Sequence, residues 1–168
     1  EKAKAGEETS IFLKMNSLTD RQLIDALKEA SQAGVKIKMI IRGICCILPG
    51  IEGKTDNIEV ISVVGRFLEH SRIFCFGTGE NMKMYIASAD WMTRNTENRV
   101  EIAAPIYDQK IKNSIYDTLR IMWKDNLKAR ILCSDGTYKK PEIKEGDELI
   151  DCQNYLRHEY KVGRKIKL

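Results

Sequence analysis

Apolar residues in the first third of the chain are grouped into short runs separated by polar segments. Runs with four apolar residues in six predict β-strands at 10–15, 36–41 and 58–63. Between the first two runs, Ile24 and Leu27 belong to a helical repeat that predicts a helix ending near residue 32, capped by Thr19 or Ser17. A strand, a helix and a strand in this order predict two parallel strands joined by a right-handed crossover.

The remaining pattern predicts a long loop, a hairpin, a second long helix and further strands. The glycine-rich stretch 42–57 predicts a long functional loop, and we expect a turn of helix at 65–69. The other expected elements are hairpin strands at 72–76 and 82–87, a strand at 99–106, a helix from Asp108 to near 126 and a strand at 129–133. This order of elements predicts an α/β sandwich with polar groups at its strand ends.

The two ends of the chain differ in composition from its body, which we place at 10–133. Residues 1–9 favour a helix but have no apolar face, so we interpret them as the stub of an upstream helix. The chain also begins without a methionine, and we expect it to be a fragment of a longer protein. The stretch 134–168 is a polar tail with a short helix at 149–160 and a basic end at 161–168.

Composition indicates a globular protein with a mild preference for anions. Apolar residues make up 43% and charged residues 31% of 168, and the net charge is +4. This charge is well below that of a dedicated nucleic-acid binder, so we expect no nucleic-acid partner. The five cysteines form no C-x-x-C pair, which indicates reduced thiols in the cytoplasm, with Cys45 and Cys46 in the core.

Arg42 is the first candidate for chemistry, because it ends the apolar run M-I-I-R where Gly43 lets the chain turn. An arginine there can present its planar fork to two phosphate oxygens. It can equally pair with a carboxylate at the end of the sheet. The sequence alone leaves both interpretations open.

His70 and Arg72 form the second candidate, in the stretch F-L-E-H-S-R-I-F. If both residues lie in a strand, their side chains would point to the same face, because they are two positions apart. A cationic pair on one face suits a polyanion. A lone histidine beside an apolar strand is also a common structural residue, and Arg72 can pair with Glu69 instead. Arg99, at another strand boundary, is a third candidate for the same edge.

Other polar residues carry weaker signals. Ser88 and Asp90 can orient a histidine or form a capping turn, and we interpret Trp91 as a packing anchor. The turn at 77–79 does not precede a helix, so it does not predict a phosphate-binding loop. His158 and the lysine-rich positions of the tail are interpreted as solvated surface. No zinc spacing, serine elbow or carboxylate pair is present in the sequence, and we assign no metal ligand.

Several longer motifs occur together in a fixed order, and they carry a family resemblance. They are K-M-N-S-L (14–18), I-R-G-I-C-C (41–46), V-G-R-F-L-E-H-S-R-I-F (64–74), S-A-D-W-M-x-R-N (88–95) and R-V-E (99–101). Over 10–138 the chain resembles the C-terminal catalytic domain of the long, bacterial-type polyphosphate kinases. That resemblance implies a phospholipase D-like mixed sheet flanked by helices, with a C-terminal helical tail.

Two positions depart from the phospholipase D pattern. The histidine signature is present as His70-Ser71-Arg72, but Gly77 stands where an aspartate follows it in phospholipase D. The Gly-Ser-x-Asn motif of that superfamily is replaced by A-S-A-D at 87–90. These departures favour the kinase branch over a phosphodiesterase.

The resemblance implies reversible transfer of the γ-phosphate of ATP to inorganic polyphosphate by a magnesium-dependent phosphotransferase. Arg42 and His70 match family residues that contact the nucleotide phosphates, and Arg99 matches one placed near the nucleotide. The phosphorylated histidine and the Mg²⁺ ligands of the family lie upstream of this chain. ATP, ADP, polyphosphate and the upstream domains are therefore the expected partners, and the full enzyme is expected to form a homo-oligomer.

Two other functions are compatible with the same residues. One is a phospholipase D-like phosphodiesterase or nuclease that dimerises to bring two copies of His70 together. The other is a non-catalytic module in which the basic groups only bind polyanions. The kinase interpretation predicts that this chain alone is inactive. It also predicts a cytoplasmic location and leaves peripheral membrane association open.

Overall fold

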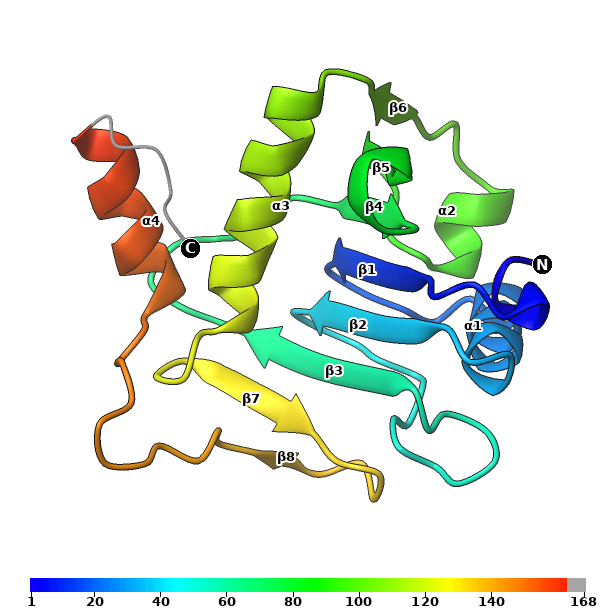
Figure 1. Ribbon diagram of the computed structural model, residues 1–168, viewed down its shortest axis with the longest axis horizontal. Helices are drawn as coiled ribbons and strands as arrows, with labels where there is room; N and C mark the ends of the chain where they lie inside the picture. The colour runs from blue at the N-terminus through cyan, green and yellow to red at the C-terminus, as the bar shows by residue number, and fades with distance from the viewer. Residues whose placement is uncertain (163–168) are drawn as a thin grey trace.

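The computed structural model describes residues 1–162, which form one mixed sheet with helices on both faces (Figure 1). The strands are β1 (Ser10–Met15), β2 (Lys36–Ile41), β3 (Ile58–Val63), β4 (Ile73–Phe76), β5 (Lys83–Ala87), β6 (Ala103–Ile106), β7 (Ala129–Leu132) and β8 (Tyr138–Lys139). The helices are α1 (Arg21–Gln32), α2 (Thr93–Glu97), α3 (Gln109–Trp123) and α4 (Cys152–Lys161), with 3₁₀ turns η1 (Ala3–Ala5) and η2 (Gly79–Asn81). The strand order is β6-β5-β4-β1-β2-β3-β7-β8.

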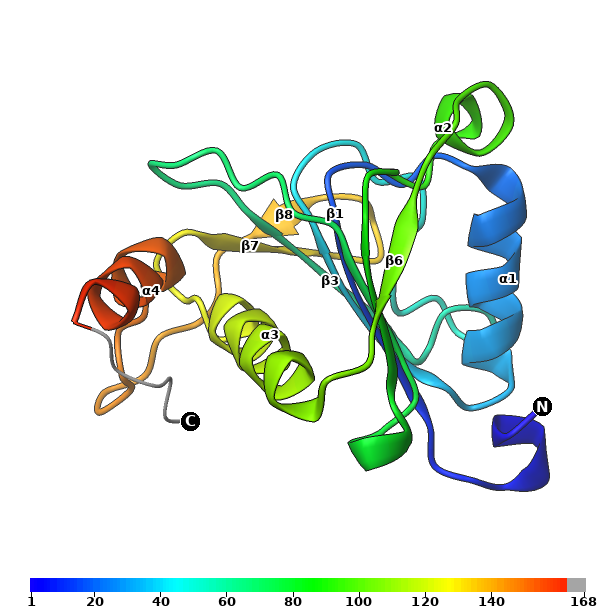
Figure 2. The same ribbon diagram turned by 90° about the horizontal axis from the view of Figure 1, so that it is seen from above.

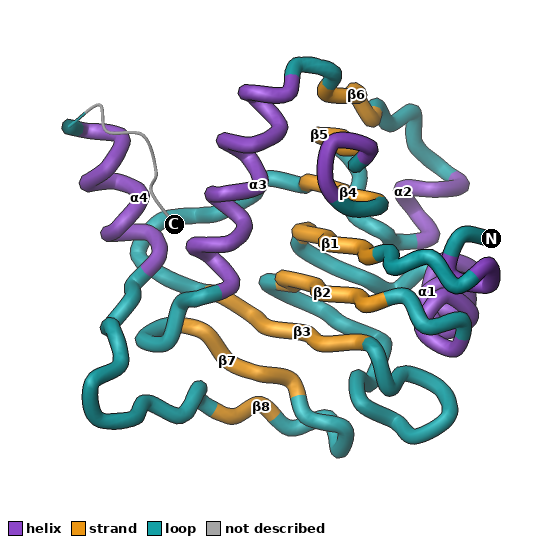
Figure 3. Tube along the Cα trace, in the orientation of Figure 1, coloured by secondary structure: helices purple, strands orange, loops and turns teal. Residues whose placement is uncertain are grey.

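The sheet combines a parallel centre with antiparallel edges, and this confirms the expected mixed α/β fold. Strand β1 pairs with β2 and β2 with β3 in parallel, whereas β4 pairs with β1 and β7 with β3 in antiparallel fashion. The predicted hairpin is formed by β4 and β5. The loop 42–57, which connects β2 to β3 in the chain, runs back along the sheet (Figure 3).

Both faces of the central sheet are buried, which explains why its strands are nearly continuous in apolar residues. Helix α1 covers one face and helices α3 and α4 cover the other (Figure 2). Leu27 of α1 packs in one core cluster with strand residues such as Leu13 and Met39. On the opposite face, Leu119 of α3 and Leu156 of α4 belong to a second cluster. The tail after residue 133 thus contributes β8 to the sheet and α4 to the core.

Two local predictions about helices are wrong. Helix α1 is capped by Asp20, whose Oδ1 accepts a hydrogen bond from the backbone N–H of Leu23 at 3.0 Å, and not by Thr19 or Ser17. The expected turn of helix at 65–69 is absent, because the side chain of Gln153 in α4 binds this segment. It accepts from the Phe67 N–H at 2.8 Å and donates to the Phe67 carbonyl at 2.7 Å.

Other differences concern the edges of the fold. Strand β6 begins at Ala103 and not at residue 99, because its ladder with β5 ends at the pair Ala87 and Ala103. The short elements α2 and β8 were not predicted, and the expected N-terminal helix stub is a single 3₁₀ turn. The basic end expected at 161–168 falls largely on residues 163–168, which lie outside the described residues.

The five cysteines are free thiols, as expected, but Cys46 is not in the core. It is exposed, whereas Cys45 is half-buried and Ile47 is buried. The backbone N–H of Cys46 donates to the Leu18 carbonyl, and in such an extended segment alternate side chains point to opposite sides. Within residues 1–162, no helix has the length and apolar content needed to cross a membrane.

Candidate functional site

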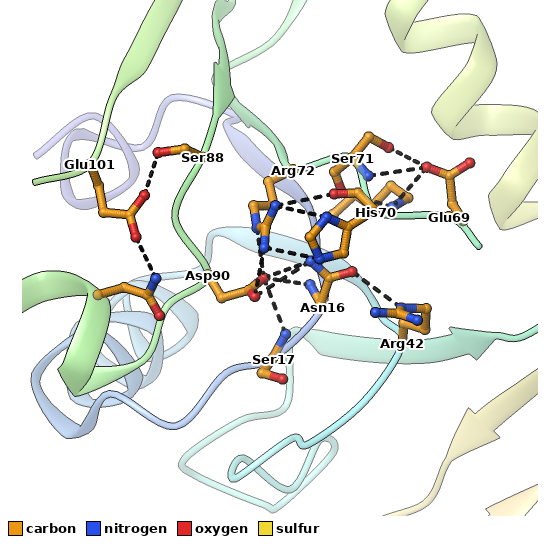
Figure 4. Close-up of polar contacts among 12 residues, drawn as sticks. Asn16, Ser17, Arg42, Glu69, His70, Ser71, Arg72, Ser88, Asp90 and Glu101 are labelled. Atoms are coloured by element: carbon orange, nitrogen blue, oxygen red, sulfur yellow. Dashed lines mark hydrogen bonds and ion pairs between the residues drawn. The ribbon is translucent and has the colours of Figure 1, made fainter. Parts of the chain in front are cut away.

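Four chain segments meet at one edge of the sheet and place polar side chains close together (Figure 4). Asn16 follows β1 and Arg42 follows β2, and these parallel strands end at the same edge. Strand β4 is antiparallel to β1, so Arg72 lies at the same edge, immediately before β4 begins. Asp90 follows β5, which returns to this edge beside β4. Carboxyl ends of strands are the usual place for ligand sites in open α/β sheets.

Asp90 is the most connected side chain of this cluster, and it is 7% exposed. Its Oδ1 accepts hydrogen bonds from the Asn16 backbone N–H at 2.7 Å and from Asn16 Nδ2 at 3.1 Å. Arg72 Nε donates to Oδ1 and Arg72 Nη2 donates to Oδ2, both at 3.1 Å. This two-point ion pair fixes the plane of the guanidinium.

Arg42 is joined to the same carboxylate through Asn16. Its Nε donates to Asn16 Oδ1 at 3.2 Å, and its backbone carbonyl accepts from Ser62 Oγ at 3.3 Å. The two terminal guanidinium nitrogens of Arg42 have no hydrogen-bond partner within residues 1–162. The arginine is therefore held at its Nε and has its terminal nitrogens available for another group.

His70 is exposed, and the guanidinium of Arg72 lies along its ring. Arg72 Nη1 is 3.4 Å from His70 Nδ1, and Arg72 Nη2 is 3.3 Å from His70 Nε2. The structure thus brings the predicted cationic pair together. The carboxylate partner of Arg72 is Asp90 and not Glu69, because Glu69 pairs with another cation.

That cation is Lys14, which lies beneath the segment that carries His70. Lys14 is 2% exposed, and its Nζ donates to the Ser71 carbonyl at 2.8 Å and lies 3.3 Å from Glu69 Oε1. Burial lowers the pKa of Lys14. Glu69 partly offsets this, whereas the nearby Arg42 and Arg72 lower the pKa further. The buried ammonium anchors the chain on both sides of His70.

Asp90 remains ionised despite its burial. Burial alone would raise the pKa of this carboxyl group, but the hydrogen bond and charge of Arg72 and the hydrogen bonds from Asn16 lower it below the ordinary 3.8. The hydrogen bonds from Thr96 and Leu23 likewise lower the pKa of Asp20 below 3.8. Such carboxylates stabilise the folded state while they are ionised.

We expect the domain to lose stability in acid for this reason. Both folded pKa values lie below the unfolded ones, so the contribution is complete above about pH 4 and is lost as the pH falls through the folded values. Urea unfolding followed by circular dichroism at pH 7 and at pH 3 measures the difference. Asp90→Asn should reduce this pH dependence. A free energy of unfolding that is equal at both pH values would contradict the expectation.

Comparison with known proteins places the chain in a family. A family model described as "Polyphosphate kinase C-terminal domain 2" matches residues 1–153. The chain belongs to this family. It is 52% identical over 143 residues to the polyphosphate kinase of Bacillus anthracis and 50% identical over 147 residues to that of Thermosynechococcus vestitus. These alignments include 85% and 88% of this chain, but the chain spans only 20% of the length of each relative.

Solved structures agree with this polyphosphate kinase membership. The crystal structure of polyphosphate kinase from Porphyromonas gingivalis superimposes with a TM-score of 0.90 at 38% identity, over 96% of this chain and 25% of that one. Nuc from Salmonella typhimurium, a phospholipase D family member, gives a TM-score of 0.54 at 17% identity, over 83% of this chain and 87% of its own. At that identity the likeness shows the fold alone, and it confirms the expected phospholipase D-like sheet.

The structure does not bring every predicted residue of this family member into the cluster. Arg99 is exposed in the loop between α2 and β6, and it has no hydrogen bond or ion pair within residues 1–162. Ser88 Oγ donates to Glu101 and does not contact His70. Trp91 packs on Phe74 with ring centroids 5.3 Å apart, which confirms it as a packing anchor.

Sequence reasoning missed two residues of the cluster, Lys14 and Asn16. Lys14 interrupts an apolar strand that lies in the centre of the sheet, and a lysine there requires a buried partner. Asn16 is the first residue after β1, at the edge where Arg42 follows β2. These two positions are the available signals, and both fall within the motif K-M-N-S-L.

Metal sites in proteins are groupings of side chains that supply oxygen, nitrogen or sulfur ligands. Among residues 1–162, no three His, Cys, Asp or Glu side chains are grouped so that they could hold a metal ion. The carboxylates of the cluster, Glu69 and Asp90, are already paired with Lys14 and Arg72. A magnesium ion does not fit these side chains as they are arranged.

Proposed function

We propose that this chain is the C-terminal part of an ATP:polyphosphate phosphotransferase, which reversibly transfers the γ-phosphate of ATP to inorganic polyphosphate. The observation that carries the proposal is the cluster of Arg42, His70 and Arg72 at one edge of the sheet, held by Asn16 and Asp90. Membership of the polyphosphate kinase family supports it. Because the chain spans a fifth of its relatives, we assign the complete reaction to the full-length protein.

Arg42 binds phosphate oxygens of the nucleotide. Phosphoryl transfer depends on positioning and charge stabilisation more than on covalent machinery. An arginine held at Nε, with free terminal nitrogens, can make a two-point contact with a phosphate and neutralise charge that develops in the transition state. This contact requires no large rearrangement of the side chain.

His70 is the catalytic residue that we assign to this domain. It is exposed at the cluster and faces outward, which suits a group that meets a phosphoryl group presented by the rest of the enzyme. There it stands opposite the upstream histidine that becomes phosphorylated. In its protonated form, the ring can stabilise the transferred phosphoryl oxygens or donate a proton to the leaving oxygen.

Arg72 and Arg99 have supporting roles in this proposal. Two nitrogens of Arg72 are bound to Asp90, so this arginine mainly contributes charge and holds the ring of His70. Arg99 is exposed and free within the described chain, and we place it near the nucleotide in the full enzyme. The Mg²⁺ of the reaction is bound by residues outside this chain.

The partners follow from the same reaction. They are ATP, ADP, polyphosphate and the upstream domains of the same protein, which forms a homo-oligomer in the cytoplasm. Peripheral association with a membrane is an additional part of this proposal, and sedimentation of the full-length protein with vesicles tests it separately. Nucleic acid is not a partner in this proposal, because the net charge of +4 is too low.

The experiment that tests the function uses the full-length protein with magnesium and ATP labelled at the γ-phosphate. We expect label to enter an acid-insoluble polymer, and ADP to draw it back into ATP. A folded protein that makes no polymer, but hydrolyses a bis-aryl phosphate without ATP, would identify a phosphodiesterase. Binding of polyphosphate without either reaction would identify a polyanion-binding module.

We expect the isolated 168-residue chain to make no polymer, because it lacks the phosphorylated histidine. The same labelled-ATP assay, performed on the chain and on the full-length protein at equal concentration, measures this. The full-length protein is the positive control. Sustained synthesis by the isolated chain would mean that the upstream histidine is dispensable.

A further inference from the structure

We infer that Asp90 is a positioning residue that sets both Arg42 and His70 in the orientation required for phosphoryl transfer. The inference rests on the proposed function and assigns a role to a residue that touches neither the nucleotide nor polyphosphate. Asp90 is 7% exposed and reaches each of the two functional side chains through one intermediate residue. Figure 4 shows both routes.

The first route runs through Arg72 to His70. The carboxylate receives Nε and Nη2 of Arg72, each at 3.1 Å, which fixes the plane of the guanidinium. That plane lies along the imidazole, with Arg72 nitrogens 3.3 and 3.4 Å from the two ring nitrogens of His70. Because His70 is exposed, this contact is what limits the positions that its ring can adopt.

The second route runs through Asn16 to Arg42. A carboxylate only accepts hydrogen bonds, so Asp90 draws the Nδ2 of Asn16 toward itself at 3.1 Å. The amide oxygen of Asn16 is thereby directed the other way, where it accepts from Arg42 Nε at 3.2 Å. An asparagine at position 90 carries no negative charge and has an NH₂ group in place of one carboxylate oxygen, so it cannot make the two-point contact with Arg72 and accepts more weakly from Asn16.

Charge adds to the geometric role of Asp90. Arg42 and Arg72 both lie close enough to Lys14 to act on its charge, and Asp90 supplies a negative charge beside Arg72. Without this charge, Arg72 has no carboxylate partner, and its guanidinium is free to leave His70 and compete with Arg42 for the phosphate. Loss of Asp90 should thus displace the functional groups while the sheet remains intact.

Asp20 offers a matched control for the alternative in which Asp90 only stabilises the fold. It is 5% exposed and hydrogen-bonded, like Asp90, but its partners are the Leu23 N–H at 3.0 Å and Thr96 Oγ1 at 2.7 Å. Within residues 1–162, the side chain of Asp20 makes no hydrogen bond to Arg42, His70 or Arg72. Asp20→Asn therefore tests the loss of a buried carboxylate without disturbing the cluster.

The test compares Asp90→Asn and Asp20→Asn in the full-length protein, with kcat and KM for ATP, melting temperature, and affinity for inorganic tripolyphosphate by calorimetry. For Asp90→Asn we expect kcat to fall by about 10- to 100-fold, as for other residues that orient a functional group, and tripolyphosphate to bind more weakly. Asp20→Asn should lower the melting temperature and leave kcat within about twofold of wild type.

A second variant makes the positioning role distinguishable from a general loss of stability. Asn16→Ala interrupts only the route to Arg42, so its loss of kcat should be smaller than that of Asp90→Asn. In the double variant with Asp90→Asn, the fold-loss of kcat should be smaller than the product of the fold-losses of the two single variants. If Asp90→Asn does not fold, a loss of kcat in folded Asn16→Ala, absent in Asp20→Asn, supports the same route.

The outcomes distinguish a failure of the inference about Asp90 from a failure of the proposed function. Wild-type polymer synthesis with near-normal kcat in folded Asp90→Asn would overturn the inference alone, as would equal losses in Asp90→Asn and Asp20→Asn. A wild type that makes no polymer would overturn the proposed function. In that case, weaker tripolyphosphate binding by Asp90→Asn than by Asp20→Asn would still support positioning of the anion site, and equal binding would overturn it.

Discussion

His70→Ala in the full-length protein is expected to lower polyphosphate synthesis by about a thousandfold while the protein remains folded. The ring is exposed and contacts Arg72 at its edge of the cluster, so its removal leaves no cavity in the core. What is lost is the group that stabilises or protonates the transferred phosphoryl oxygens. Labelled ATP and acid-insoluble polymer measure the rate, and circular dichroism checks the fold.

The chain contains one other histidine, which provides the control for this variant. His158 is exposed on α4 and lies 3.4 Å from the carboxylate of its neighbour Glu159. His158→Ala should synthesise polymer at the wild-type rate. If His70→Ala keeps more than about a tenth of that rate, His70 is a structural residue and the phosphoryl group is stabilised elsewhere.

The central sheet could be predicted from the sequence because its signals are local. Strands β1, β2 and β3 coincide with the apolar runs at 10–15, 36–41 and 58–63. Helix α3 begins after its predicted cap, Asp108. In each case the residues that determine the element lie within it or next to it, so a short window of sequence contains the information.

The cap of α1 was misassigned locally, but other errors occur where a distant residue determines the local structure. The segment 65–69 is held by Gln153, which is 86 positions away from Phe67 in the chain. The two residues of β8 form a strand because β7 provides the ladder. No local pattern in these segments indicates such partners, since propensity is readily overruled by tertiary contacts.

The sequence was sufficient to predict the basic side chains of the candidate site, but not the hydrogen bonds and ion pairs that connect them. Arg42 and His70 could be found because each lies next to a strand end and can serve an anion. The sequence did not determine which carboxylate pairs with Arg72, because Glu69 is near it in the chain whereas Asp90 is near it only in the fold. The buried residues that support the site can be identified only when the strand order is known, because that order places β4 beside β1.

Lys14 illustrates how that support is built, and its replacement is expected to have the largest effect on stability. Lys14→Met should lower the free energy of unfolding of the chain by about 3 kcal/mol, because it removes a buried cation together with its hydrogen bond to Ser71 and its partly buried ion pair with Glu69. The change leaves the Ser71 carbonyl without its donor and removes the cation beside Glu69, which is 30% exposed and is partly solvated afterward. Urea unfolding of both chains at pH 7 measures the difference.

Two further variants distinguish the contribution of this ion pair from that of an ordinary surface charge. Lys28 pairs with Asp25 at 2.9 Å on α1, but both side chains are largely exposed, so Lys28→Met should cost less than about 0.5 kcal/mol. Glu69→Gln added to Lys14→Met should recover part of the loss, because it removes the unpaired charge. If Lys14→Met lowers the free energy of unfolding no more than Lys28→Met does, the segment that carries His70 is held by its other contacts. These are chiefly the ion pair of Arg72 with Asp90 and the hydrogen bonds of Phe67 with Gln153.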